Sequence, residues 1–306
     1  MTKQNRNDMK KAILSLLALP LLLACSSEEN EAGGNTSRVP LQIEFDGITR
    51  SVVEGSTLPN NSAYGVFVTK STSYLYNNVL EDGFNREVTY LDGNSKFDQL
   101  VYIPENGTCY VYAYYPYNKN LTMSALEQGF PLSLTSQTDL LFTSYYGSAT
   151  ESSPYAKLSM KHVFARIHVT VKKAVGNTSD YNFYGLEMNN LFKEGYYDLA
   201  GFNTNVGKDK SGSIYLKPQN NELTDNNAIE ADFLILPGNQ TPTLSLHGST
   251  EKTATLPQKN YYANTQYDIT LTINHLGELE AGEWTIVPWD SNIQNGLDVW
   301  KDSNIN

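Results

Sequence analysis

The residues that could perform chemistry are few, and their spacing does not bring them together. The four histidines lie far apart, and none belongs to a His-Glu-x-x-His or similar metal-binding motif. His162 and His168 are six residues apart, so an unbroken strand would place both on one face, but no third ligand lies nearby. The chain also has no phosphate-binding loop, no G-x-S-x-G motif and no C-x-x-C pair. The sequence therefore predicts no enzyme, no metal site and no cofactor.

The acidic residues do not change this conclusion. Asp and Glu are abundant, but their spacing cannot single out the pair of facing carboxylates that a glycosidase needs. Asp92-Gly93-Asn94 fits a hairpin turn better than a calcium loop, because the later ligands of such a loop are missing. A glycosidase is the third hypothesis. Two carboxylates that face each other across a cleft would support it.

One cysteine has a clear chemical role. Lys10 and Lys11 precede an apolar stretch of about 13 residues, too short for the roughly 20 residues that span a bilayer. The stretch ends in Leu-Leu-Ala-Cys, which looks like a bacterial lipobox. We expect residues 1–24 to be a signal peptide that is cut between Ala24 and Cys25. Lipid on Cys25 would then anchor the chain in a membrane.

The composition limits the remaining possibilities. Loss of residues 1–24 removes four basic residues and one acidic residue, so the net charge falls from −11 to −14. This argues against nucleic-acid binding. Residues 25–37 are acidic and small and are predicted to form a flexible tether. Cys109 is then the one remaining thiol, so no intrachain disulfide forms, and its strand-like surroundings indicate a small buried hydrophobe.

The rest of the sequence is typical of strands. Apolar and polar residues alternate between turn signals, and long helical periodicity is missing apart from a turn at Ala125–Phe130. Tyr110, Tyr112 and Tyr114 share one strand face, where core packing is a better interpretation than ligand stacking. The predicted strands are Leu41–Phe45, Ala63–Val68, Phe97–Ile103, Tyr110–Tyr115, Asp139–Phe142, Ala165–Val171, Tyr184–Met188, Ser213–Leu216, Asp232–Leu236, Thr243–Leu246, Tyr267–Ile273 and Glu283–Val287.

Strands joined by turns predict an all-β protein of antiparallel sheets. The mature length suits two β-sandwich domains in tandem. The first would cover 38–157 and the second 158–306, with a Ser/Thr-rich linker at Gly147–Pro154. The position of this border is defined only to about ten residues on either side.

Several segments together resemble the fimbrillin family (Mfa-like, type V pilin subunits) of Bacteroidales-type bacteria. They are the lipobox, Ile48-Thr49-Arg50 after an early strand, Tyr64–Val68, Val111–Tyr117, Leu158–Ile167, Ile235-Leu236-Pro237 and Trp284–Trp289. The resemblance covers nearly all of the mature chain. It implies two transthyretin-like β-sandwich domains, no enzymatic activity, a lipid anchor at the cell surface, and assembly into a fimbria (pilus) after an Arg-specific protease removes the first strand.

The resemblance also implies sites. The first strand would be the one that carries Leu41, Ile43 and Phe45, and the cut would fall between Arg50 and Ser51, with Arg38 as the alternative. A strand from another subunit would then fill the vacated groove. Two C-terminal segments could donate that strand; their apolar residues are Trp284, Ile286 and Trp289 in one, and Leu297 and Val299 in the other. The expected partners are other fimbrial subunits, the protease, outer-membrane lipid and a host or bacterial surface ligand.

A second hypothesis comes from a different class of protein. A glycan-binding surface lipoprotein that works beside an outer-membrane transporter would also consist of β-sandwiches. Trp300 or Tyr261-Tyr262 would then be the aromatic platforms on which sugars stack. Loss of polysaccharide binding in Trp300→Ala would favour this hypothesis over the fimbrial one.

Overall fold

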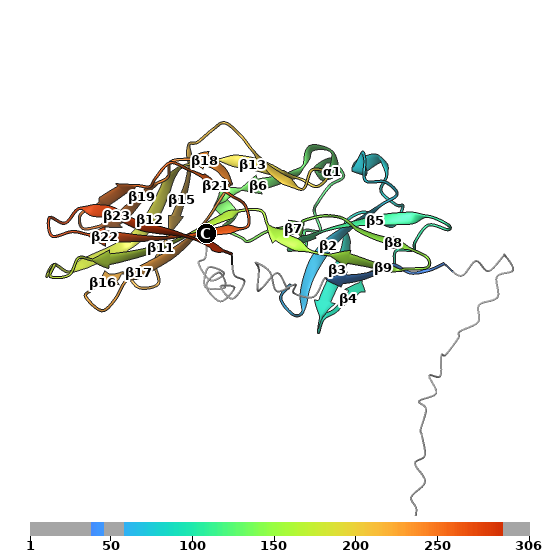
Figure 1. Cartoon of the computed structure of the whole chain (residues 1–306), viewed down its shortest axis with the longest axis horizontal. Helices are drawn as coiled ribbons and strands as arrows, with labels where there is room; N and C mark the ends of the chain where they lie inside the picture. Colours follow the sequence, from blue (N-terminus) through green and yellow to red (C-terminus); the bar gives the residue numbers. More distant parts are fainter. Residues whose placement is uncertain (1–37, 46–57, 290–306) are drawn as a thin grey trace, which may run out of the picture. The chain divides into compact units, whose positions relative to one another are not determined.

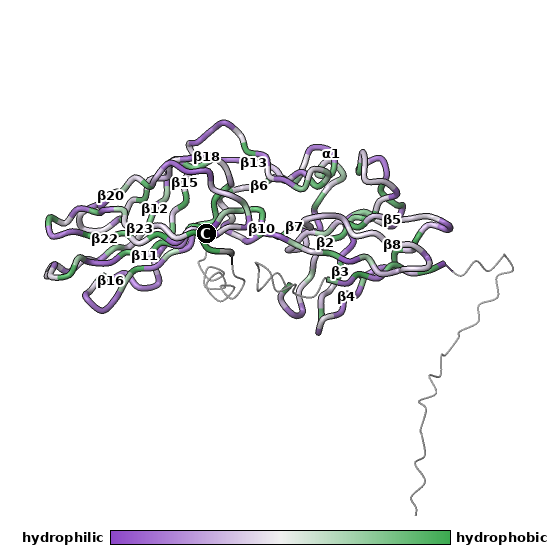
Figure 2. The backbone as a smooth tube through the Cα atoms, viewed as in Figure 1, coloured by the Kyte–Doolittle hydropathy of each residue, from purple (hydrophilic) through white to green (hydrophobic). Residues whose placement is uncertain are grey.

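A computed structural model describes residues 38–45 and 58–289. Within these ranges nearly every element is a strand, and the exceptions are the short helix α1 (Ser124–Gln128) and two 3-10 turns, η1 (Leu75–Asn77) and η2 (Leu134–Ser136). The predicted all-β fold is confirmed, and α1 confirms the predicted helical turn. Figure 2 shows that hydrophilic residues concentrate in the loops that join the strands.

The N-terminal half is built on one large sheet. Its strands follow the order β10-β7-β5-β2-β3-β4, and β8 also pairs with β5. The bounds are β2 (Ser62–Thr69), β3 (Arg86–Leu91), β4 (Asn94–Phe97), β5 (Thr108–Tyr115), β7 (Leu141–Thr143), β8 (Gly147–Thr150) and β10 (Met160–His162). A separate two-stranded sheet contains β1 (Gln42–Phe45) and β9 (Tyr155–Leu158).

Two larger sheets form the C-terminal sandwich. One has the order β17-β11-β22-β23, and the other has the order β15-β12-β19-β20 with β16 beside β12 (Figure 1). The first sheet contains β11 (Ala165–Lys173), β17 (Ile229–Ile235), β22 (Thr265–Ile273) and β23 (Leu279–Pro288). The second contains β12 (Tyr181–Leu191), β15 (Gly212–Leu216), β16 (Glu222–Leu223), β19 (Thr243–Gly248) and β20 (Lys252–Thr255).

Two small sheets complete the fold. One joins β6 (Phe130–Ser133) to β13 (Glu194–Asp198) and β14 (Asn203–Val206), and the other pairs β18 (Gly238–Gln240) with β21 (Lys259–Tyr261). Hydrogen bonds between β6 and β13 therefore link the two halves of the chain. The described residues from 38 onward form one compact unit. The two tandem domains and their border at 157/158 stay a prediction.

The central strands of the N-terminal sheet are buried on both faces. Tyr112 and Tyr114 of β5 join a cluster that continues into the C-terminal sandwich. Cys109, Val111 and Ala113 point the other way, into a second cluster. Because both faces of β5 are buried, almost all of its residues are apolar or aromatic. The predicted packing roles of the tyrosine row and of Cys109 are confirmed, and burial raises the pKa of the Cys109 thiol to about 11.

Sequence reasoning was wrong in two details of the sheets. Not all pairs are antiparallel, because β1 runs parallel to β9 and β11 runs parallel to β22. Parallel partners need long crossover connections, which local turn signals do not reveal. The strand predicted at Phe97–Ile103 does not form, since β4 ends at Phe97 and the following residues contribute only an isolated bridge at Tyr102. Val101 and Ile103 are nonetheless buried, so the alternation predicted burial correctly there.

The two histidines considered as a metal pair lie on different strands with different partners. His162 of β10 places Nδ1 2.8 Å from Asp139, and His168 of β11 places Nδ1 2.8 Å from Asp232. Asp232 also accepts a hydrogen bond from the buried Arg166 guanidinium at 2.9 Å. No group of three or more His, Cys, Asp or Glu side chains that could hold a metal ion occurs in the described ranges.

The His168–Asp232 pair should make stability depend on pH. Its hydrogen bond raises the pKa of His168, against the opposing effect of burial. A raised pKa stabilises the fold fully below the unfolded value of about 6.5, and this contribution is lost as the pH rises through the folded pKa. Urea unfolding should therefore show that His168→Gln costs more at about pH 5.5 than at about pH 8.5. An equal cost at both pH values, or the same trend in the control His275→Gln, would contradict this.

Candidate functional site

The first described segment lies between two other parts of the chain. On one side, Leu41 N–H donates to the carbonyl of Val101 at 2.9 Å, and Ile103 N–H donates to the carbonyl of Val39 at 3.0 Å. On the other side, β1 pairs with β9 along its whole length, and Gln42 N–H donates to the carbonyl of Pro154 at 2.9 Å. Figure 1 shows this blue segment directly beside β9. The segment is thus held by backbone hydrogen bonds on both edges.

The side chains of this segment alternate as the sequence predicts. Leu41 is 2 % exposed and Ile43 is 6 % exposed, whereas Gln42 and Glu44 face solvent. Phe45 is half-buried and packs edge-on against Tyr64, with ring centroids 5.3 Å apart. The three apolar residues cover the second cluster of the N-terminal sheet. The predicted roles of Leu41, Ile43 and Phe45 in a first strand therefore have a physical basis.

Loss of β1 would leave an apolar groove with open backbone groups on both sides. A fully buried large apolar side chain contributes roughly 2 kcal/mol and the half-buried Phe45 about half as much, so Leu41, Ile43 and Phe45 together contribute about 5 kcal/mol. The N–H of Ile103 and the carbonyls of Val101 and Pro154 would lose their partners as well. Unpaired edges of this kind readily accept another strand. Without β1, the groove would match an extended segment with an apolar-polar alternation.

The predicted cleavage and lipid sites fall mostly outside the described residues. Ala24, Cys25, Arg50 and Ser51 all lie there. Arg38 is described and exposed, and its guanidinium carbon lies 4.6 Å above the centre of the Tyr102 ring. Arg38 precedes β1, so a cut at this residue would keep the strand in place.

Of the two candidate donor segments, the structure describes 284–289 and does not describe 293–299. Trp284 and Ile286 belong to β23, which pairs with β22, and Ile286 is 55 % exposed. Trp289 follows β23 and is 2 % exposed, with its ring stacked on His162 at a centroid distance of 4.0 Å. Leu297 and Val299 lie outside the described residues. Use of 284–289 as a donor would require both the loss of an existing strand pair and the removal of a tryptophan from the core.

Sequence reasoning missed the contact between Trp289 and His162, because the two residues are far apart in the chain. We expect Trp289→Ala to lower the free energy of unfolding by about 3–5 kcal/mol, since a buried tryptophan leaves a large cavity. The exposed Ile286 provides the matched control, and Ile286→Ala should change stability by less than about 0.5 kcal/mol. Chemical denaturation measures both values. Similar losses in the free energy of unfolding of the two variants would show that the buried Trp289 does not hold the end of β23 in the core.

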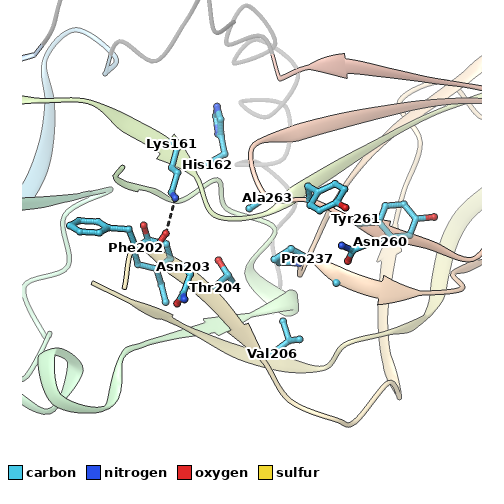
Figure 3. A pocket seen from close by; sticks show the side chains of 13 residues that line it. Lys161, His162, Phe202, Asn203, Thr204, Val206, Pro237, Asn260, Tyr261 and Ala263 are labelled. Carbon is cyan, nitrogen blue, oxygen red and sulfur yellow. Dashed lines mark hydrogen bonds between the residues drawn. The ribbon is translucent and has the colours of Figure 1, made fainter. Parts of the chain in front are cut away.

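A second feature is a cavity of about 420 Å³ beside β10, β14 and β21 (Figure 3). Its lining includes Tyr261 and Tyr262, the pair that the sequence offered as a sugar platform. Tyr261 is fully buried, so its ring is not available for stacking, whereas Tyr262 is 62 % exposed. The other proposed platform, Trp300, lies outside the described residues.

No helix among the described residues is both long enough and apolar enough to cross a membrane.

A search of curated protein sequences finds no match to the chain. Solved structures do share its fold. A candidate cell adhesion protein from Bacteroides uniformis is 17% identical, with a TM-score of 0.61, and the alignment covers 84% of this chain and 100% of that one.

Two further structures are similar. A candidate cell adhesion protein from Bacteroides ovatus is 15% identical, with a TM-score of 0.61 and coverage of 83% of this chain and 98% of that one. A fimbrial protein from Bacteroides vulgatus is 14% identical, with a TM-score of 0.56 and coverage of 82% and 99%. At these identities the likeness establishes the fold.

The family follows from a sequence comparison. The family model described as fimbrillin-like matches residues 49–289, which is most of the chain. This is a family of fimbrial structural proteins, so the prediction of a non-enzymatic protein is confirmed. The chain belongs to the fimbrillin-like family.

Proposed function

We propose that the protein is a structural and adhesive subunit of a cell-surface fimbria, and that it assembles by exchange of its first strand. One observation carries this proposal: β1 is a short segment, held on both edges, that covers an apolar core. Family membership supports a fimbrial role and association with other fimbrial subunits. The solved structures with the same fold include a fimbrial protein and candidate cell adhesion proteins.

Export would place the subunit at the membrane before assembly. In this proposal the chain is cut between Ala24 and Cys25, and lipid on Cys25 holds it in the outer membrane, at the cell surface. An Arg-specific protease then cuts after Arg50. The lipid, the tether and β1 leave together, because all three precede the cut. The groove between Val101–Ile103 and β9 becomes free for a partner strand.

The donor strand is most simply supplied by the C-terminal segment Ile293–Val299. Leu297 and Val299 alternate with Asp298, as a strand with one buried face requires. The burial of Trp289 and the pairing of β23 with β22 favour this segment over Trp284–Trp289. Main-chain hydrogen bonds would provide affinity, and the pockets vacated by Leu41, Ile43 and Phe45 would provide specificity.

Proteolysis of purified chains that begin at residue 26 tests the site of the cut. An Arg-specific protease should release a fragment that ends at Arg50, as identified by mass spectrometry, and oligomers should follow in size-exclusion chromatography. Arg50→Gln should prevent both events, whereas Arg38→Gln should leave both unchanged. A processed product that stays monomeric at every concentration would count against the proposal.

A further inference from the structure

The floor beneath the end of β1 contains buried hydroxyl groups that the apolar side chains of β1 do not satisfy. Tyr64 of β2 is 0 % exposed, and Ser95 belongs to β4. Tyr64 Oη and Ser95 Oγ are both buried, and neither has a hydrogen-bond partner within residues 38–45 and 58–289. Burial raises the pKa of Tyr64, and the nearby Ser95 hydroxyl partly counters this rise. Because buried polar groups are normally hydrogen-bonded, this pair needs an explanation.

Both hydroxyls lie on the face of the sheet that β1 covers. Tyr64 belongs to the apolar cluster under β1, and the ring of Phe45 packs edge-on against Tyr64 and Tyr90 at centroid distances of 5.3 and 5.6 Å. Ser95 is the register partner of Tyr90 and so shares its face, and β1 also packs against β4. Ser62, the other register partner of Tyr90, adds a third buried hydroxyl without a partner in the described ranges.

The ring of Phe45 has no polar atom, so a different side chain at its place would suit these hydroxyls better. A buried polar group without a partner costs free energy, and a partner of good geometry removes that cost. A side-chain amide offers donors and an acceptor in one short group, and each hydroxyl can both donate and accept. A charged group would be less suitable, because neither Tyr64 nor Ser95 offers an opposite charge.

The donor segment proposed above carries an amide at the matching distance from its apolar residues. Leu297 and Val299 are two residues apart, which is the spacing of the two fully buried residues of β1. A donor strand that ran opposite to β1 would place these two at the buried positions and Asn295 at the place of Phe45. A donor strand in the direction of β1 would bring Lys301 to that place instead. The uncharged hydroxyls favour the first arrangement.

We propose that the groove recognises a side-chain amide at the place of Phe45, and that Asn295 of another subunit supplies it in a donor strand antiparallel to β1. This inference rests on the strand exchange proposed above. The amide of Asn295 accepts a hydrogen bond from one of the Tyr64 and Ser95 hydroxyls and donates to the other. The donor therefore satisfies groups that β1 leaves without partners, and this difference favours the donor over β1 as the final occupant of the groove.

Substitutions at position 45 of the monomeric chain that begins at Ser26 test the amide site without any assembly. Phe45→Asn and Phe45→Ala both remove the ring, but only Phe45→Asn supplies an amide. The Tm of Phe45→Asn should be about 2–4 °C above that of Phe45→Ala, as one net hydrogen bond predicts. The difference should disappear when Ser62→Ala, Tyr64→Phe and Ser95→Ala together remove the hydroxyls. Equal Tm values in the presence of the hydroxyls, or a difference that persists without them, would overturn the amide site.

Assembly of chains that begin at Ser51 tests the role of Asn295. Asn295→Ala should raise the protein concentration at half-assembly about tenfold in sedimentation velocity, because the hydrogen bonds of the amide are lost. Asp298→Ala changes the opposite face of the same strand and is the matched control, which should leave this concentration unchanged.

Two outcomes would overturn the assignment of Asn295. They are unchanged assembly in Asn295→Ala, and an equal effect of Asn295→Ala in chains that lack the three hydroxyls. Absence of assembly in every chain that begins at Ser51 would refute strand exchange itself and with it the role of Asn295. The Tm comparison would still decide whether the groove accepts an amide, so the two failures can be distinguished.

Discussion

A chain that begins at Ser51 is expected to form oligomers whose size increases with protein concentration, whereas the chain that begins at Ser26 stays monomeric. The reason is the groove that β1 leaves, with about 5 kcal/mol of lost apolar burial and unpaired backbone on both edges. A loss of this size is comparable to the whole stability of many domains, about 5–15 kcal/mol. The groove will therefore take any strand that fits it. Sedimentation velocity across a dilution series measures the effect.

Two control chains show whether the oligomers form by the proposed route. A chain from 51 to 289 lacks both β1 and the C-terminal segment, and it should remain monomeric while still binding an added peptide that spans residues 38–46. A chain from 39 to 306 lacks the tether but keeps β1, and it should behave like the longer monomer. Equal assembly of the chain from 51 to 289 would show that the C-terminal segment is not the donor.

A disulfide across the first strand should block assembly until it is reduced. Glu44 and Lys157 are register partners on β1 and β9, and both side chains are exposed. Adjacent strands lie about 4.8 Å apart, which is within the roughly 4.4–6.8 Å that a disulfide spans between Cα atoms. Glu44→Cys combined with Lys157→Cys should therefore keep β1 attached after the chain is cut. We expect the cut, oxidised protein to stay monomeric and to assemble within one experiment once reductant is added.

Each single cysteine variant is the control for this experiment. Cys109 is fully buried and has a raised thiol pKa, so it should not interfere with the exchange. Both single variants should assemble after cleavage whether or not reductant is present. If the cut double variant assembled at the same rate with and without reductant, β1 would not need to leave its groove before assembly.

The sequence predicted some parts of this fold well because local pattern determined them. The alternation at Leu41–Phe45 and at Ala165–Val171 gave both strand position and buried face, since a half-buried strand has a period of two. The tyrosine row of β5 was predicted to lie in the core because tyrosine is a strong strand former with a large apolar ring. The role proposed for the first strand came from the family resemblance, because local pattern cannot indicate it.

Other parts depend on contacts between distant residues. No local signal indicates that β1 pairs with β9 or that Trp289 stacks on His162, because about 110 and 130 residues separate the partners. The strand β9 could have been found, since Tyr155–Leu158 alternates exposed and buried residues after Pro154. The hydrogen bond from Lys161 to the Phe202 carbonyl could not have been found, because the two residues are 41 positions apart.

The most direct test of the account asks which segment occupies the groove after assembly. Oligomers would be formed from equal amounts of two chains that begin at Ser51, one with Lys157→Cys and one with a single cysteine placed in turn at each of residues 293–300. The account predicts a disulfide between the two chains at alternate positions of this segment, as a paired strand requires, and its loss when a peptide of residues 38–46 competes. Oligomers that form without any such disulfide, while β9 remains accessible to the peptide, would contradict it.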